Sequence, residues 1–137
     1  MTTTTVTITG KSWDEERVGE VEGAHAVARA TFTTEWQGEI SGTSTCWLLI
    51  SYVDGDPDKP ETLVGPYAGY ELVEATIGDR SGTFVLAATG DHRGGVAKTA
   101  LTIVDGSGTG DLAGIRGSGS YAADAMEYSM ELDYEVE

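Results

Sequence analysis

The 137-residue sequence lacks several common features, and each absence excludes a class of protein. Its single cysteine, Cys46, excludes an intrachain disulfide framework, and the absence of asparagine excludes N-glycosylation. The longest apolar run, residues 46–50, is far too short to cross a bilayer. The opening MTTTTVTITG has neither the basic start nor the apolar run of a signal peptide. We therefore expect a cytoplasmic protein that has no membrane partner.

Basic residues are scarce as well, with 8 Lys and Arg against 23 Asp and Glu and a net charge of −15. Such a field repels phosphate backbones, so we expect no nucleic-acid partner. His25 and His92 are isolated from one another and from Cys46, which predicts no metal site. No lysine-containing phosphate loop is present, and the one glycine pattern at 117–122 lacks the strand–helix–strand context of a dinucleotide site. We expect no cofactor.

What the chain does contain is a series of segments in which apolar and polar residues alternate, the pattern of half-buried strands. Between Tyr128 and Val136 every second residue is apolar and the others are polar. Turn signals separate the segments. The predicted strands span residues 2–13, 24–40, 43–53, 62–77, 83–89, 96–104, 115–122 and 128–136.

The intervening segments carry further expectations. Acidic residues 14–23 and the DGDPDKP stretch at 54–60 are predicted to be loops. The run 46–50 is apolar at every position, which is typical of a strand covered on both faces. Pro66 predicts an edge, a bulge or a break in its strand. The glycine-dense residues 106–119 predict a compact corner with one short helical turn at 111–113.

About eight strands joined by short turns indicate either a sandwich or a closed barrel in a single domain of residues 1–137. We favour an all-β, eight-stranded antiparallel barrel. The interior of such a barrel is either filled by side chains or holds one small ligand.

Several stretches resemble the small bacterial DUF3224 family. They are GDRSGTFV at 78–85, VDGSGTGDLAGIRG at 104–117, the Gly69-Tyr70-Glu71 triplet and ELDY at 131–134. The resemblance implies a barrel of the allene oxide cyclase-like (calycin-like) type, in which the glycine corner returns one strand beside the next. It also implies a cofactor-independent cyclase or isomerase of secondary metabolism that acts on a small apolar molecule. The alternative is a non-catalytic ligand-binding or structural barrel. Barrels of this group often associate, so a homo-oligomer is expected.

The chain departs from the family pattern at several positions. Where members often carry a glutamate, a Gln-His pair and a tryptophan, this chain has Trp47, Ala87-Ala88 and Leu101. If these positions line the barrel, its interior is more apolar than is usual in the family. Both an apolar ligand pocket and a filled core agree with that change.

Glu71 is the first candidate for catalysis, with Tyr67 on the same predicted face of its strand. Inside an apolar barrel, burial raises the pKa of a carboxyl toward the range useful for proton transfer. The alternative is a structural ion pair of Glu71 with Arg29 or Arg80.

The candidate substrate-binding residues supply aromatic walls, hydroxyl donors or apolar contacts, and core packing is the alternative for the aromatic ones. For Arg29 the alternatives are a solvated face and a polar barrel lining. Cys46 is predicted to be a small buried hydrophobe. The substrate-binding candidates are Arg29, Trp36, Trp47, Leu49, Tyr52, Leu101 and Tyr121.

Overall fold

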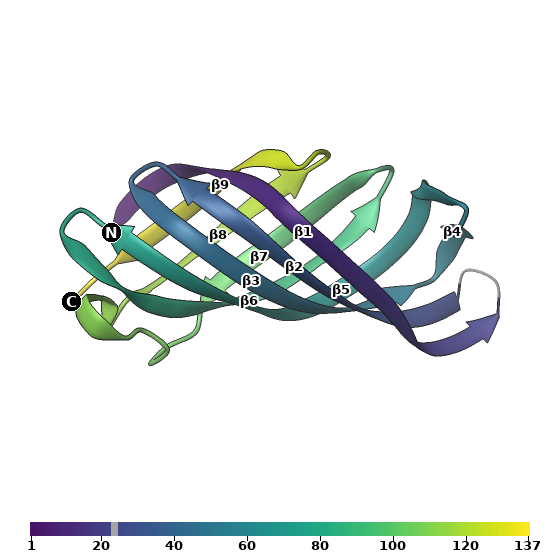
Figure 1. The fold of residues 1–137 in the computed structure, drawn as a ribbon, viewed down its shortest axis with the longest axis horizontal. Helices are drawn as coiled ribbons and strands as arrows, with labels where there is room; N and C mark the ends of the chain where they lie inside the picture. Colours follow the sequence, from purple (N-terminus) through teal and green to yellow (C-terminus); the bar gives the residue numbers. More distant parts are fainter. Residues whose placement is uncertain (23–24) are drawn as a thin grey trace.

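The computed structural model describes residues 1–22 and 25–137, and its strands form one antiparallel sheet that closes into a barrel (Figure 1). Pairing of the strand at residues 40–52 with the strand at residues 59–77 completes the ring. A further short strand, β4 (Asp54–Asp56), pairs with the second of these two strands. The expected eight-stranded all-β barrel is confirmed. In order around the ring the strands are β3 (Ile40–Tyr52), β2 (His25–Gln37), β1 (Thr2–Glu22), β9 (Glu127–Glu135), β8 (Arg116–Ala123), β7 (Val96–Ile103), β6 (Arg80–Arg93) and β5 (Lys59–Ile77).

The core lies inside the ring and follows from the alternation of the strands. On β2, every second residue from Ala26 to Trp36 is buried. On β5, Tyr67, Glu71 and Val73 are buried, while Tyr70 between them is exposed. The predicted alternation of both strands is therefore confirmed, and the structure decides which face is interior: the face of Ala28 on β2 and that of Glu71 on β5. Because the ring is closed, this single layer encloses its own core.

Strand β1 changes the face that it turns inward partway along its length. Val6 and Ile8 are fully buried, and two positions after Ile8 the register joins Gly10 to Thr34. The following pair joins Ser12 to Thr33, so Lys11 is an extra residue, a β-bulge. Because side chains alternate with a period of two, one extra residue exchanges the two faces. After this bulge the odd-numbered residues from Trp13 to Arg17 face inward, and a second register shift between Arg17 and Gly19 exchanges the faces again.

The glycine corner closes one end of the barrel. Its short 3₁₀ helix η1 (Gly110–Leu112) places Leu112 and Ile115, both buried, in the core. The corner follows the edge of β6, where the Thr109 amide donates to the Thr83 carbonyl at 2.8 Å. Gly82 is required beneath it, because a Cβ there would lie 2.0 Å from the Thr109 carbonyl oxygen. The predicted helical turn is confirmed, and we call this end the closed end.

Three expectations about the connections need correction, and one holds. Residues 14–22 continue β1 instead of forming a loop, since they pair with β2; residue 23 of that predicted loop and residue 24 of the next predicted strand lie outside the described residues. The segment 54–60 contains β4 and the start of β5 around a tight turn. The run 46–50 is covered on its inner face only: Trp47 and Leu49 are 44% and 56% exposed. Of the edge, bulge or break expected at Pro66, an edge is present: β5 runs unbroken from Lys59 to Ile77, but its pairing with β3 ends at Tyr67.

Candidate functional site

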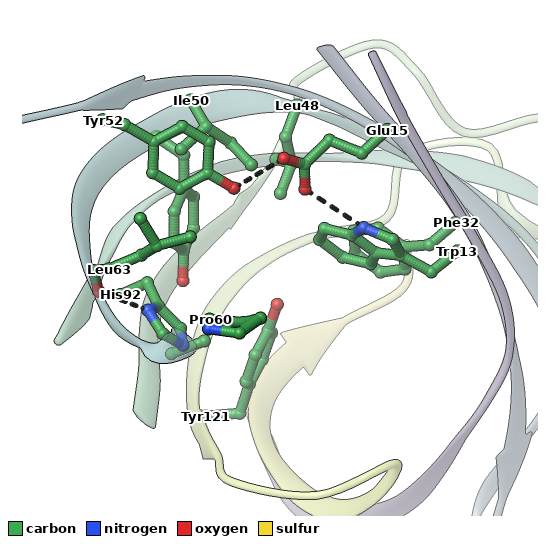
Figure 2. Close-up of a pocket in the computed structure, with 12 residues that line it drawn as sticks. Trp13, Glu15, Phe32, Leu48, Ile50, Tyr52, Pro60, Leu63, His92 and Tyr121 are labelled. Atoms are coloured by element: carbon green, nitrogen blue, oxygen red, sulfur yellow. Dashed lines mark hydrogen bonds between the residues drawn. The ribbon is translucent and has the colours of Figure 1, made fainter. Parts of the chain in front are cut away.

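A cavity of about 320 Å³ occupies the end of the barrel opposite the glycine corner, which we call the open end (Figure 2). Most of its lining is apolar or aromatic, which is typical of small-molecule sites. The rim of the cavity is formed by the second half of β1 and the start of β5, which extend past the other strands at this end of the barrel. The lining residues are Trp13, Glu15, Phe32, Leu48, Ile50, Tyr52, Pro60, Leu63, Tyr67, His92, Ala97 and Tyr121.

Glu15 holds a fixed position on one wall of the cavity. The Tyr52 hydroxyl donates to Glu15 Oε2 at 2.7 Å, and the Trp13 indole nitrogen donates to Oε1 at 3.1 Å (Figure 2). Burial raises the pKa of the Tyr52 hydroxyl, and its bond to Glu15 raises the pKa further. Tyr52 therefore remains a proton donor to Glu15 at neutral pH.

Two hydroxyls and one imidazole complete the polar part of the lining. The Tyr67 hydroxyl lies 2.6 Å from the Thr99 hydroxyl. The Tyr121 hydroxyl points toward the centre of the cavity in Figure 2, and burial raises its pKa. His92 Nδ1 lies 2.8 Å from the Leu63 carbonyl oxygen, an acceptor, so Nδ1 carries the proton of this hydrogen bond.

Glu71 lies deeper in the barrel and is not among the residues that line the cavity. It is 2% exposed and pairs with Cys46, two register positions toward the closed end from Leu48. Its Oε2 accepts a hydrogen bond of 2.6 Å from the Ser44 hydroxyl. Thr34 and the Trp36 indole extend the same hydrogen-bonded chain. These core side chains therefore satisfy the hydrogen-bonding needs of the Glu71 carboxyl.

Burial raises the pKa of the Glu71 carboxyl above its usual range, and the Ser44 hydroxyl and the Trp36 indole lower it only in part. The ion pair considered with Arg29 or Arg80 is not formed: Arg29 pairs with Glu16 on the outer surface, and no ion pair of the described residues includes Glu71. Without a cation beside it, the buried carboxyl favours its neutral form. The raised pKa expected for an interior Glu71 is confirmed.

The structure distributes the predicted site residues over three places. Tyr52, Tyr67 and Tyr121 come together in the cavity lining. Glu71, Trp36 and Leu101 face the interior but belong to the packed core, as does Cys46, whose thiol pKa is raised by burial. A third group faces outward and lines no part of the cavity, because odd-numbered residues of β2 and β3 point away from the core: Arg29, Trp47 and Leu49.

Sequence reasoning missed Trp13, Glu15, Phe32 and His92 as lining residues. Two of them follow the bulge at Lys11, and the predicted loop at 14–23 removed Glu15 from consideration. A usable signal was present, because Trp13 and Glu15 are two residues apart and share a face of any strand that contains both. Among the described residues no group of three or more His, Cys, Asp or Glu is placed to hold a metal ion. No helix in the described part of the chain has the length and apolar character needed to cross a membrane.

Comparison with known proteins identifies a family whose function is not known. The family model "Protein of unknown function (DUF3224)" matches residues 4–134. A solved DUF3224 structure of unknown function from Shewanella oneidensis MR-1 superposes with a TM-score of 0.79 at 23% identity, covering 100% of this chain and 98% of that one. A structure described as pyocyanin demethylase reaches a TM-score of 0.42 at 14% identity, with 98% and 100% covered. No curated protein sequence matches this chain.

Proposed function

The chain belongs to the DUF3224 family, and we propose that it binds a small, mostly apolar molecule in the cavity at the open end of its barrel. The observation that carries the proposal is the cavity itself, an apolar hollow into which a few polar groups converge. Such a combination is the usual form of a ligand site. Its volume of about 320 Å³ lies near the lower limit for such pockets, which restricts the ligand to the size of two or three fused rings.

A matched pair of alanine substitutions on β7 tests this proposal. Ala97 lines the cavity, whereas Ala100 on the same strand is exposed on the outer face. Ala97→Phe fills the cavity and is expected to weaken binding of the neutral probe naphthylethanol at least tenfold, measured by isothermal titration calorimetry. Ala100→Phe adds the same ring outside and is expected to leave the affinity unchanged. Equal affinity in both variants would place the ligand elsewhere and overturn the proposal.

The finer proposal is a cofactor-independent cyclase or isomerase that acts on the same apolar molecule. It is supported by groups that accept and donate protons on walls of one cavity: the Glu15 carboxylate, the His92 imidazole and the Tyr121 hydroxyl. A proton shift needs such a pair within reach of one substrate. Tyr67, proposed as catalytic from the sequence, also lines the cavity. Glu71 lies beneath it, so a catalytic Glu71 requires the core to open.

Steady-state kinetics with a substrate that the protein converts distinguish a catalytic Glu15 and Tyr121 from a catalytic Glu71. Glu15→Gln and Tyr121→Phe are expected to lower kcat more than KM rises, because both groups act on the reacting atoms. Glu71→Gln is expected to change kcat little, since Glu71 does not touch the cavity. A full loss of kcat in Glu71→Gln, with the fold intact by circular dichroism, would restore Glu71 as the catalytic carboxyl.

We also propose that two or more copies of the chain associate through the outer face of β3 and β5. Trp47 lies opposite Tyr70 across the two strands, and Leu72 lies opposite Thr45. Trp47, Tyr70 and Leu72 are 44%, 59% and 39% exposed, an unusual gathering of large apolar side chains on an outer surface. Light scattering is expected to give an oligomeric mass for the native chain and a monomeric mass for Trp47→Glu. A monomeric native chain would refute this proposal.

A further inference from the structure

Glu15 places a carboxylate in the lining of the cavity. The twelve lining residues include this one carboxylate and neither Lys nor Arg. The ion pairs among the described residues are Lys11–Glu35, Arg29–Glu16, Arg116–Glu135 and Arg116–Glu137, and none of them involves Glu15. Arg17 lies near enough to Tyr52 to lower its pKa, so it adds positive charge near the Tyr52–Glu15 pair from outside the lining. Within the lining itself, no Lys or Arg offsets the charge of Glu15.

The hydrogen bonds of Glu15 fix its orientation and leave part of its acceptor capacity open. Each carboxylate oxygen accepts one bond, from Trp13 or from Tyr52. An ionised carboxylate has about four acceptor positions, so one position on each oxygen remains. Both donors are neutral groups, so they orient the carboxylate without cancelling its charge. A ligand that donates a proton and carries a positive charge matches what remains.

Aromatic rings surround the same space. Trp13 stacks on Phe32 with ring centroids 5.1 Å apart and planes inclined by 17°, and the pair forms one wall (Figure 2). Tyr52 and Tyr121 add rings on other sides of the cavity. The face of an aromatic ring attracts a cation, most strongly for tryptophan. A flat aromatic body packs well against the same rings.

From the carboxylate and the rings together, we infer that the cavity selects a flat aromatic cation, a molecule of two or three rings that bears a protonated amine. The ammonium group donates to the free positions of Glu15, and the ring system lies against the Trp13–Phe32 stack. This inference rests on the proposed function, because it names the ligand class of the same cavity. The net charge of −15 also draws cations toward the molecule in general, so the test must separate that field from Glu15 itself.

Three probes of one shape and different charge test the inference: naphthylethylammonium, naphthylethanol and naphthylacetate. Calorimetric titration of the native chain at neutral pH is expected to rank the cation roughly tenfold above the alcohol, a difference of about 1.4 kcal/mol. The acetate is expected to bind most weakly. Glu15→Gln keeps the shape of the side chain and is expected to remove the preference for the cation, while the alcohol binds as before.

Glu16→Gln is the matched control, because it removes the same charge from the neighbouring residue, whose side chain pairs with Arg29 on the outer surface. The preference for the cation is expected to survive in this variant. Equal loss in both variants would assign the effect to the overall field and overturn the inference. Equal binding of all three probes to the native chain would also overturn it, while leaving the cavity a ligand site. If none of the probes binds, the proposed function itself fails.

Discussion

The two ends of this barrel are built from the same eight strands, yet they treat their interior polar groups in opposite ways. At the closed end, Trp36, Phe84 and Leu112 fill the space, and Glu71 is bonded to Ser44 within the core. At the open end, Glu15 and Tyr121 border a cavity. A polar group that is satisfied from within holds a structure together, whereas one that faces a hollow is available to a ligand. Location along the barrel, more than residue type, separates the two carboxyls.

The two phenylalanines of the chain give the largest expected effect, because one lies in each half. Phe84 is fully buried and meets Trp36 edge to face, with ring centroids 6.3 Å apart. Phe84→Ala leaves a void in a packed core and is expected to lower the free energy of unfolding by about 3–5 kcal/mol. Phe32 already borders a cavity, so Phe32→Ala is expected to cost about 1.5–3 kcal/mol. Urea denaturation measures both, and equal losses would show that the open end is packed as tightly as the closed end.

The buried Glu71 gives the next effect, a dependence of stability on pH. Because burial raises the pKa of Glu71 in the folded chain, the folded state keeps this proton to a higher pH than the unfolded state does. Its contribution to stability is complete below the ordinary glutamate pKa of 4.5 and declines as the pH rises toward the raised value. The slope within this window approaches about 1.4 kcal/mol per pH unit.

Glu71→Gln isolates this contribution, since it removes the titration and keeps an oxygen for Ser44. The free energy of unfolding of the native chain minus that of the variant is expected to fall with rising pH across the window. The measurement is urea denaturation of both proteins at a series of pH values. A difference that rises with pH would mean that the folded chain holds Glu71 charged, and the contrast with Glu15 would disappear.

The closed end was the more predictable half from the sequence. Alternation along β2, β5 and β9 identified which residues share a face, and the glycine spacing identified the corner with its helical turn. These signals are local, because a period of two and the backbone freedom of glycine act over a few residues. Parity grouped Glu71 with Tyr67 and Val73, but which face of β5 is interior came from the structure.

The open end was less predictable because it depends on a bulge and on strands that leave the ring. The extra residue Lys11 exchanges the faces of β1, and no simple alternation indicates it. Beyond the bulge, residues 14–22 pair with β2 but are themselves exposed, and they have no apolar periodicity. Trp47 and Leu49 were predicted to be covered because their strand is apolar on both faces, yet both are exposed on the outer face. An apolar sequence shows that two faces could be covered, but it does not show which part of the molecule would cover the second.

Two tyrosines that border the cavity at different depths give smaller effects. The Tyr67 hydroxyl bonds to Thr99, which is buried, so Tyr67→Phe leaves a hydroxyl without its partner and is expected to cost about 1–3 kcal/mol. The Tyr52 hydroxyl bonds to Glu15 near the rim, where water replaces it, so Tyr52→Phe is expected to cost about 0.5–1.5 kcal/mol. Thermal denaturation followed by circular dichroism compares the two. The reverse order would indicate that water does not reach the rim.

Arg29 gives the smallest effect and tests the contrast between the inside and the outside of one strand. It lies on β2 between the buried Ala28 and Ala30, and its side chain pairs with Glu16 where the two side chains are 56% and 60% exposed. Exposed ion pairs contribute at most about 1 kcal/mol, so Arg29→Gln is expected to change the free energy of unfolding by less than that. The affinity for naphthylethanol is expected to stay the same. A tenfold weaker affinity, measured by calorimetry with the fold intact, would return Arg29 to the binding site and move the ligand to the outer surface, because no inward rotation of one side chain carries it through a closed sheet.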